Sequence, residues 1–159
     1  MIRYFLIIFL ALAMFLPTAQ AEDFEYTTCY SGTFALFHNV KELPPVMNWA
    51  ENGIATSDNM KFNNMTFHCE GVQLAGSNNR KGYGFCTSKD IDGDVTIYEL
   101  GPYSGPGGQG KFVEGSGKWK GVKGSFEWSR VLQNKPGQAA LPGTYQGCRK
   151  VKGTFELPK

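Results

Sequence analysis

The sequence predicts an all-β fold, a single closed antiparallel β-barrel of about eight strands. Composition is the first reason, because 20 glycines, 8 prolines, 12 phenylalanines and 7 tyrosines favour strands and turns over helices. The second reason is that apolar and polar residues alternate with a period of two in several segments, as they do where one face of a strand is buried. The third is that turn sequences separate these segments at short intervals, which predicts consecutive hairpins.

The alternation predicts the individual strands. It is clearest in residues 150–157, which place valine, glycine, phenylalanine and leucine on one face and polar side chains on the other. The other predicted strands are residues 24–37, 65–70, 82–88, 95–100, 110–113 and 125–129. Turn sequences at residues 76–79, 92–93, 107–108 and 115–117 lie between them.

One long stretch, residues 38–64, interrupts this pattern. Pro44 and Pro45 block a strand there, and residues 46–52 are expected to form a short helix before Gly53. We expect this long irregular loop to plug one end of the barrel. A second irregular stretch, residues 134–143, is rich in Pro, Gly and Ala and predicts an exposed loop before the last strand.

Residues 1–21 are predicted to be a cleaved signal peptide. Arg3 is followed by an apolar run over residues 4–15 and by Ala19-Gln20-Ala21, the small-residue pattern that signal peptidase cleaves. A membrane anchor would need about 20 apolar residues, more than this run provides. The mature chain, residues 22–159, is therefore expected to be one secreted or periplasmic domain without a membrane span.

The charge balance argues against a nucleic-acid partner. The formal net charge is only +2, and the lysines late in the chain alternate with glycines and aromatic residues, as on solvated strand faces. A monomer is the default expectation.

The four cysteines all follow the predicted cleavage site, and they allow three disulfide pairings. Cys69 and Cys86 flank a single predicted turn, so an antiparallel hairpin would bring them together. Cys29 and Cys148 then remain, in the first and last predicted strands, where a bond would close the barrel. A zinc site of four cysteines is the alternative, and it lacks the short ligand spacings that such sites use.

Residues 115–126 carry the densest local pattern, Gly-Ser-Gly-Lys-Trp-Lys-Gly-Val-Lys-Gly-Ser-Phe. This pattern resembles the late hairpin of the allene oxide cyclase and dirigent barrel group, and of small secreted bacterial relatives of unknown function. Cys69-Glu70-Gly71, residues 82–86 and the Asp-rich residues 90–94 follow the order seen in those relatives, with Gly84-Phe85 as an extra pair. The resemblance implies a calycin-like closed barrel. It implies no activity, because the catalytic residues of the plant cyclase have no match here.

Aromatic side chains are expected to line the barrel and to bind a small apolar or aromatic molecule. The candidate lining residues are Trp49, Phe85, Tyr98, Trp119 and Trp128. Two alternatives remain open. The same rings could fill the interior completely, which would leave a structural or surface role, or the chain could be an isomerase-like or cyclase-like enzyme.

No catalytic residue is predicted, so an enzyme is not the favoured interpretation. His68 lies on the strand face opposite Cys69, and no nucleophile-elbow or phosphate-loop motif occurs. An enzyme on an apolar substrate would need a carboxylate pointing into the barrel. The candidates for that carboxylate are Glu70, Glu99 and Glu127.

Asp90, Asp92 and Asp94 are the candidate metal ligands. Three carboxylates within five residues can converge on Ca²⁺, which prefers oxygen ligands. The alternative is an ordinary Asp-Gly turn between two strands, because Gly93 does not stand where a helix-loop-helix calcium site has its glycine. No other cofactor is expected.

Overall fold

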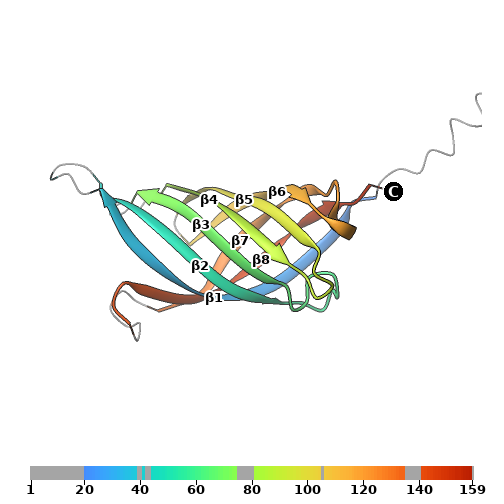
Figure 1. Ribbon diagram of the computed structural model, residues 1–159, viewed down its shortest axis with the longest axis horizontal. Helices are drawn as coiled ribbons and strands as arrows, with labels where there is room; N and C mark the ends of the chain where they lie inside the picture. The colour runs from blue at the N-terminus through green and yellow to red at the C-terminus, as the bar shows by residue number, and fades with distance from the viewer. Residues whose placement is uncertain are drawn as a thin grey trace, which may run out of the picture.

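A closed antiparallel barrel is the architecture of this chain, as the sequence predicts (Figure 1). The computed structural model describes residues 20–38, 41, 44–74, 81–104, 106–134 and 141–158. The strands are β1 (Glu22–His38), β2 (Val46–Thr56), β3 (Thr66–Leu74), β4 (Gly82–Lys89), β5 (Val95–Ser104), β6 (Gly107–Gly115), β7 (Lys123–Gln133) and β8 (Thr144–Glu156). A single short 3-10 helix, η1 (Gly117–Trp119), accompanies them in the described part of the chain.

Some predicted features fall outside the described residues. They are residues 1–19 of the predicted signal peptide, the predicted turn at 76–79 and residues 135–140 of the predicted loop. In the part of the chain that is described, no helix is long and apolar enough to cross a membrane.

Each strand pairs with the next one along the chain, and β8 returns to pair with β1. That closing pairing runs from Glu22 opposite Phe155 to Thr33 opposite Thr144. Closure leaves no unpaired sheet edge, which removes the usual route to edge-to-edge aggregation. Alternate residues of every strand then point inward, where aromatic side chains form one continuous core.

The predicted helix over residues 46–52 is wrong, because these residues begin β2. Trp49, Glu51 and Ala55 alternate toward the interior, and β2 pairs with β1 on one side and with β3 on the other. Hydrogen bonds to two neighbouring strands outweigh the weak local preference for a helix turn. Gly107 and Gly108, predicted as a turn, likewise form the first residues of β6.

The plug expected from the irregular loop is shorter than predicted and consists of residues 57–65. Phe62 and Met65 are buried in this segment, and Phe62 stacks on Phe24 with ring centroids 4.5 Å apart. Trp119 of η1 packs beside Phe62, at 5.3 Å between centroids. We call this end of the barrel the plugged end, and the end where β2 and β8 begin the far end.

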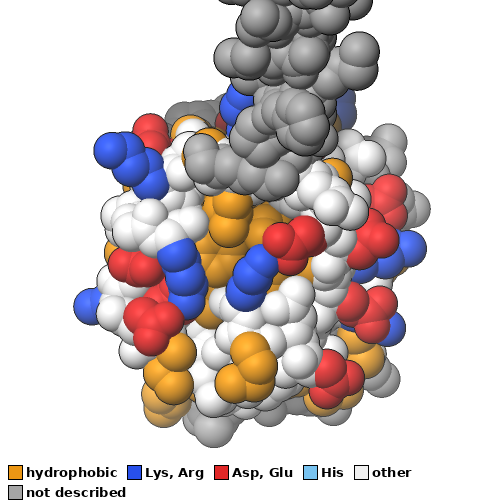
Figure 2. Space-filling model, turned by 90° about the vertical axis from the view of Figure 1, so that its right-hand side faces the viewer, with side chains coloured by type: hydrophobic (Ala, Val, Ile, Leu, Met, Phe, Trp, Pro, Cys, Tyr) orange, Lys and Arg blue, Asp and Glu red, His pale blue; other side chains and the backbone are white. Residues whose placement is uncertain are grey.

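The plugged end, viewed along the barrel, presents a small apolar area among charged side chains of both signs (Figure 2). The charges are paired in part: Lys61 binds Glu22 at 2.7 Å, and Lys118 binds Asp92 at 2.7 Å. Met60 and Ile91 are exposed apolar residues of the turns at this end. At the far end, the β1–β2, β3–β4 and β7–β8 connections lie partly or wholly outside the described residues.

Both predicted disulfides form, and they lie on opposite faces of the barrel wall. Cys69 and Cys86 face inward and are each only 1% exposed, whereas Cys29 lies on the outer surface. Cys29 joins Cys148 across the closing β1–β8 pair. The two bonds therefore differ in their access to solvent.

We expect a water-soluble phosphine, added without denaturant, to reduce Cys29–Cys148 well before Cys69–Cys86. The reductant must reach a sulfur atom of the disulfide, and the surrounding core keeps it away from the buried Cys69–Cys86 bond. Timed alkylation followed by peptide mass spectrometry measures both rates. Equal rates under native conditions would contradict this expectation, and in urea the two rates should converge.

Candidate functional site

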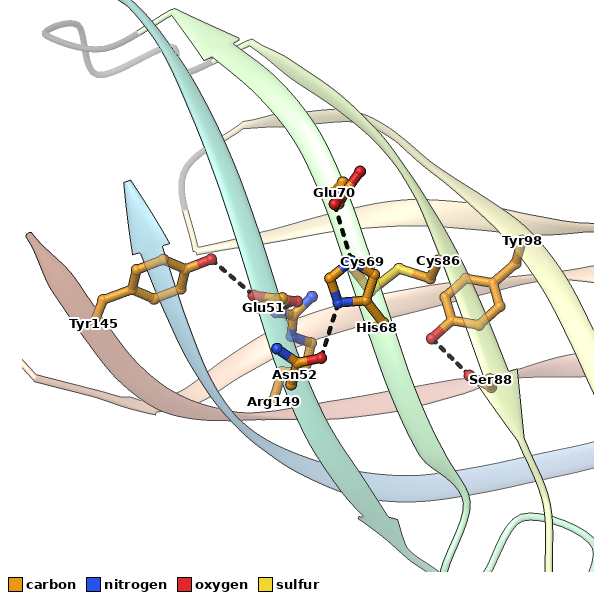
Figure 3. Close-up of a disulfide and its surroundings, with 10 residues drawn as sticks. All are labelled: Glu51, Asn52, His68, Cys69, Glu70, Cys86, Ser88, Tyr98, Tyr145 and Arg149. Atoms are coloured by element: carbon orange, nitrogen blue, oxygen red, sulfur yellow. Dashed lines mark hydrogen bonds and ion pairs between the residues drawn. A yellow bond between two sulfur atoms is a disulfide. The ribbon is translucent and has the colours of Figure 1, made fainter. Parts of the chain in front are cut away.

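A buried ion pair lies at the centre of the barrel. Glu51 of β2 and Arg149 of β8 are 2% and 8% exposed, and Arg149 Nη2 donates a hydrogen bond to Glu51 Oε1. The Tyr145 hydroxyl donates to the other carboxylate oxygen at 3.2 Å (Figure 3). Both oxygens of the carboxylate therefore have a donor, which a buried charge requires.

Aromatic rings enclose the Arg149 guanidinium. Its central carbon lies 4.2 Å from the centre of the Tyr30 ring and 5.1 Å from that of Trp128. Such contacts with ring faces stabilise a cation that has lost its water. Burial is the largest single influence and disfavours the charged form, but the charge of Glu51, its hydrogen bond and the neighbouring phenols together outweigh burial and raise the pKa of Arg149 above its ordinary value.

Inward-facing glycines make room for the large rings around this pair. A side chain at Gly32 would collide with the Tyr145 ring, and one at Gly71 or Gly84 would collide with Trp49. Small barrels commonly alternate small and large inward residues, because the interior is narrow. These glycines therefore stand at the positions where a large ring from another strand needs the space.

Among the described residues, two small cavities lie inside the barrel. The one toward the far end, here the far-end cavity, has a volume of about 50 Å³ and lies next to Glu51, Tyr145 and Arg149. The second, of about 30 Å³, lies deeper, and its lining is mostly apolar and aromatic, with a few hydroxyl groups and the inner disulfide. A water needs about 10–15 Å³ measured in this way, and drug-sized ligands occupy about 300 Å³ or more. The interior is therefore mostly filled by side chains.

Several buried hydrogen-bond donors without an acceptor belong to side chains that line the far-end cavity, and two of these side chains, Trp128 and Arg149, also line the deeper cavity. Among the residues that the structure describes, nothing accepts a hydrogen bond of normal geometry from Trp49 Nε1, Trp128 Nε1, Arg130 Nε or Arg149 Nε. The Tyr103 hydroxyl is the polar group beside Trp49. All four donor side chains line the far-end cavity. A buried donor without a partner costs about 1–3 kcal/mol. A ligand that brings a hydrogen-bond acceptor into the cavity would therefore satisfy these donors.

The phenols beside the cavity are neutral hydroxyl groups. Burial raises the pKa of Tyr103 to about 12, and burial together with the charge of Glu51 raises that of Tyr145. The Tyr103 hydroxyl donates to Gln73 Oε1 at 3.2 Å. Neither phenol adds negative charge to the cavity at physiological pH.

The predicted lining residues divide between three places. Trp49, Tyr98 and Trp128 face the interior. Trp119 is fully buried at the plugged end, away from the far-end cavity. Phe85 is 58% exposed, because it alternates with the inward residues Gly84 and Cys86 and so faces outward, which excludes it from the barrel lining.

The carboxylates considered for catalysis also lie outside the core. Glu70 and Glu127 are exposed, and Glu99 pairs with Lys111 on the outer surface at 3.0 Å. The interior carboxylate is Glu51, which the sequence analysis missed because it assigned this segment to a helix. Arg149 was detectable, since it continues the inward alternation of residues 151–157 by one step toward the N-terminus.

The Asp-rich turn holds η1 against the β4–β5 connection. Asp90 accepts hydrogen bonds from Trp119 Nε1 at 2.7 Å and from the backbone N–H groups of Asp92 and Asp94 at 2.9 and 3.0 Å. Asp94 accepts the backbone N–H of Lys118, whose ammonium binds Asp90 and Asp92. Within the described residues, no group of three His, Cys, Asp or Glu side chains is arranged to hold a metal ion.

A groove of about 920 Å³ lies on the outer face of β1 and β5–β8. Its walls are polar side chains, and Glu99 and Lys111 in it are already paired. The two aromatic residues beneath it, Phe24 and Phe126, are buried. Unlike the far-end cavity, this groove has neither exposed rings nor buried donors without a partner among its lining residues.

Comparisons with known proteins identify the fold and nothing finer. No family model matches the chain, and no curated protein matches it. A solved structure of a pterocarpan synthase dirigent protein is similar, with a TM-score of 0.52 and 10% sequence identity. The match covers 90% of this chain and 95% of that one. The shared feature is a dirigent-like barrel.

Replacing Glu51 by Gln should lower the free energy of unfolding by about 3–5 kcal/mol, because it leaves the buried charge of Arg149 without a partner. Adding Arg149→Met to this variant should restore most of the loss. Lys150→Met is the matched control, since it removes a surface partner of Glu25 and should cost at most about 1 kcal/mol. Urea unfolding measures all three variants, and equal losses for Glu51→Gln and Lys150→Met would contradict the expectation.

Replacing Asp90 by Asn should make the free energy of unfolding depend less on pH in the acidic range. Burial is the largest single influence and opposes ionisation of Asp90, but the hydrogen bonds from Trp119, Lys118 and the Asp94 backbone, together with the charge of Lys118, outweigh it and lower the pKa of this carboxyl below its usual value of 3.8. The stabilisation that ionised Asp90 contributes is therefore complete above the pKa that this carboxyl has in the unfolded chain. It is lost as the pH falls through the lower pKa that the carboxyl has in the folded protein.

Urea unfolding at pH 7, 5 and 3 measures this effect. The wild type should exceed Asp90→Asn by about 1–3 kcal/mol at pH 7, and the difference should shrink below about pH 4. The exposed control Asp23→Asn should stay within about 0.5 kcal/mol of the wild type. A difference for Asp90→Asn that is constant with pH would contradict the assignment.

Proposed function

We propose that this chain is a secreted or periplasmic binding protein that takes a small aromatic molecule end-on into the far-end cavity. The observation that carries the proposal is the group of buried donors without acceptors, located beside a wall of aromatic rings. Buried polar groups are normally partnered, and exceptions concentrate at functional sites. A ligand acceptor would supply the missing partner.

The size of the cavity defines how such a ligand binds. A volume of about 50 Å³ accommodates a polar head group and not an entire ring. The ring would remain at the far end, among Phe34, Tyr103 and Tyr145, of which the first two are only partly buried. Ring stacking in such a position contributes about 0.5–1.5 kcal/mol per pair.

The fold comparison supports a small-molecule role by analogy. The similar barrel is, by its name, a pterocarpan synthase. A shared fold does not transfer an activity, so this likeness supports binding in the barrel and no particular reaction. The two disulfides are in keeping with an oxidising compartment, and so with the predicted signal peptide.

Catalysis is the weaker alternative. A general acid or base must exchange a proton with its substrate. Glu51, the carboxylate in the interior, is instead held by Arg149 and Tyr145. A role restricted to the outer surface would leave the buried donors without a function.

The test uses three single-ring probes that differ in one substituent: benzoate, benzamide and toluene. Titration monitored by backbone amide NMR should show saturable shifts around the far end for at least one probe. Gln73→Trp should abolish binding of the tightest probe, because Gln73 is a buried residue of the cavity wall. Val72→Trp is the matched control, since the neighbouring Val72 is 49% exposed and faces outward.

Loss of binding in Gln73→Trp with retention in Val72→Trp supports the proposal. Absence of saturable binding for all three probes overturns it, as does equal binding to both variants. Circular dichroism and thermal unfolding establish that each variant is folded before it is titrated.

A further inference from the structure

We infer that the head group received by the far-end cavity is a carboxylate, so that the ligand is an aromatic carboxylic acid in its ionised form. This inference rests on the proposed function and adds the chemical class of the ligand. Three independent features of the cavity carry it: the kind of polar group left unpartnered, the net charge of the lining, and the way the rings cover Arg149.

The unpartnered polar atoms of this cavity are all donors. Trp49, Trp128 and Arg149 line this cavity and are each more than nine-tenths buried, and each has an N–H group that forms no hydrogen bond of normal geometry with a described residue. An indole N–H and a guanidinium N–H cannot act as acceptors. A ligand that matches them must therefore bring acceptor oxygens, and a carboxylate brings two oxygens with about four lone-pair sites.

The charged residues of the lining leave an excess of positive charge. They are Glu51, Arg130 and Arg149, one acid and two bases. Glu51 forms an ion pair with Arg149, and the buried phenols Tyr103 and Tyr145 stay protonated. An anionic ligand would balance the remaining charge, whereas a neutral acceptor would not. Hydrogen bonds to a charged group are also about twice as strong as those between neutral groups.

The rings around Arg149 leave only its edge available for hydrogen bonds. Tyr30 and Trp128 lie within 4.2 and 5.1 Å of the guanidinium carbon. The N–H groups of a guanidinium lie in its plane, so Nη2 reaches Glu51 while Nε remains for another acceptor. The same side chain can therefore hold Glu51 and an incoming carboxylate together.

The aromatic surface beyond this donor group suits a planar ligand body. Phe34 stacks on Tyr145 with centroids 4.2 Å apart, and Tyr103 packs edge-on against Trp128 at 5.7 Å. A ring that carries the carboxylate could extend along these side chains toward the far end. Aliphatic acids of equal size would lose these ring contacts.

The test compares benzoate, benzamide and toluene by isothermal titration calorimetry at pH 7. Benzoate should bind at least tenfold more tightly than benzamide, and toluene more weakly still. Trp49→Phe and Trp128→Phe remove one N–H each and keep a ring. Either change should weaken benzoate binding about tenfold, as expected for one hydrogen bond to a charged group, and should leave toluene binding within about twofold.

Trp119→Phe is the matched control. It removes the same N–H group at the plugged end, where Asp90 accepts it, and it should leave benzoate affinity unchanged. Benzamide or toluene binding as tightly as benzoate would overturn the carboxylate assignment while the binding function stands. Equal losses for all three probes in Trp49→Phe and Trp128→Phe would also overturn it. No binding of any probe would overturn the binding function itself.

Discussion

The pairing of β1 with β8 is the constraint on which the rest of this structure depends. It converts a chain of hairpins into a closed wall, so the number of strands fixes the width of the interior. An eight-stranded barrel is just wide enough for side chains to meet across it. Glu51 and Arg149, on the two strands that flank β1, therefore reach each other inside the wall although 98 residues separate them in the sequence.

This narrow interior explains the glycines. A large ring on one strand requires a residue without a side chain on a neighbouring strand, as Trp49 requires Gly71 and Gly84. The arrangement produces a densely packed core with two small cavities. It also holds the Arg149 guanidinium between Tyr30 and Trp128, where it remains charged in spite of burial.

Stability alone does not explain the polar interior. A buried ion pair contributes little net stability compared with apolar side chains of similar volume, because both charges lose their hydration. Donors without acceptors cost further free energy. Conflicts of this kind concentrate at functional sites. The plugged end shows the contrast, since Trp119 Nε1 has its acceptor in Asp90 there.

The sequence by itself predicted the all-β class, because two-residue alternation and turn chemistry are local signals. It favoured the observed disulfide pairs among the three allowed pairings, since Cys69 and Cys86 flank one predicted turn. It also identified Trp49, Tyr98 and Trp128 as interior candidates, but it placed Phe85 inside and missed Glu51. The strand β2 has no strong local signature and forms through hydrogen bonds to β1 and β3. Only the tertiary structure decided the site, because contacts between β2 and β8 depend on closure, and closure is a property of the whole chain.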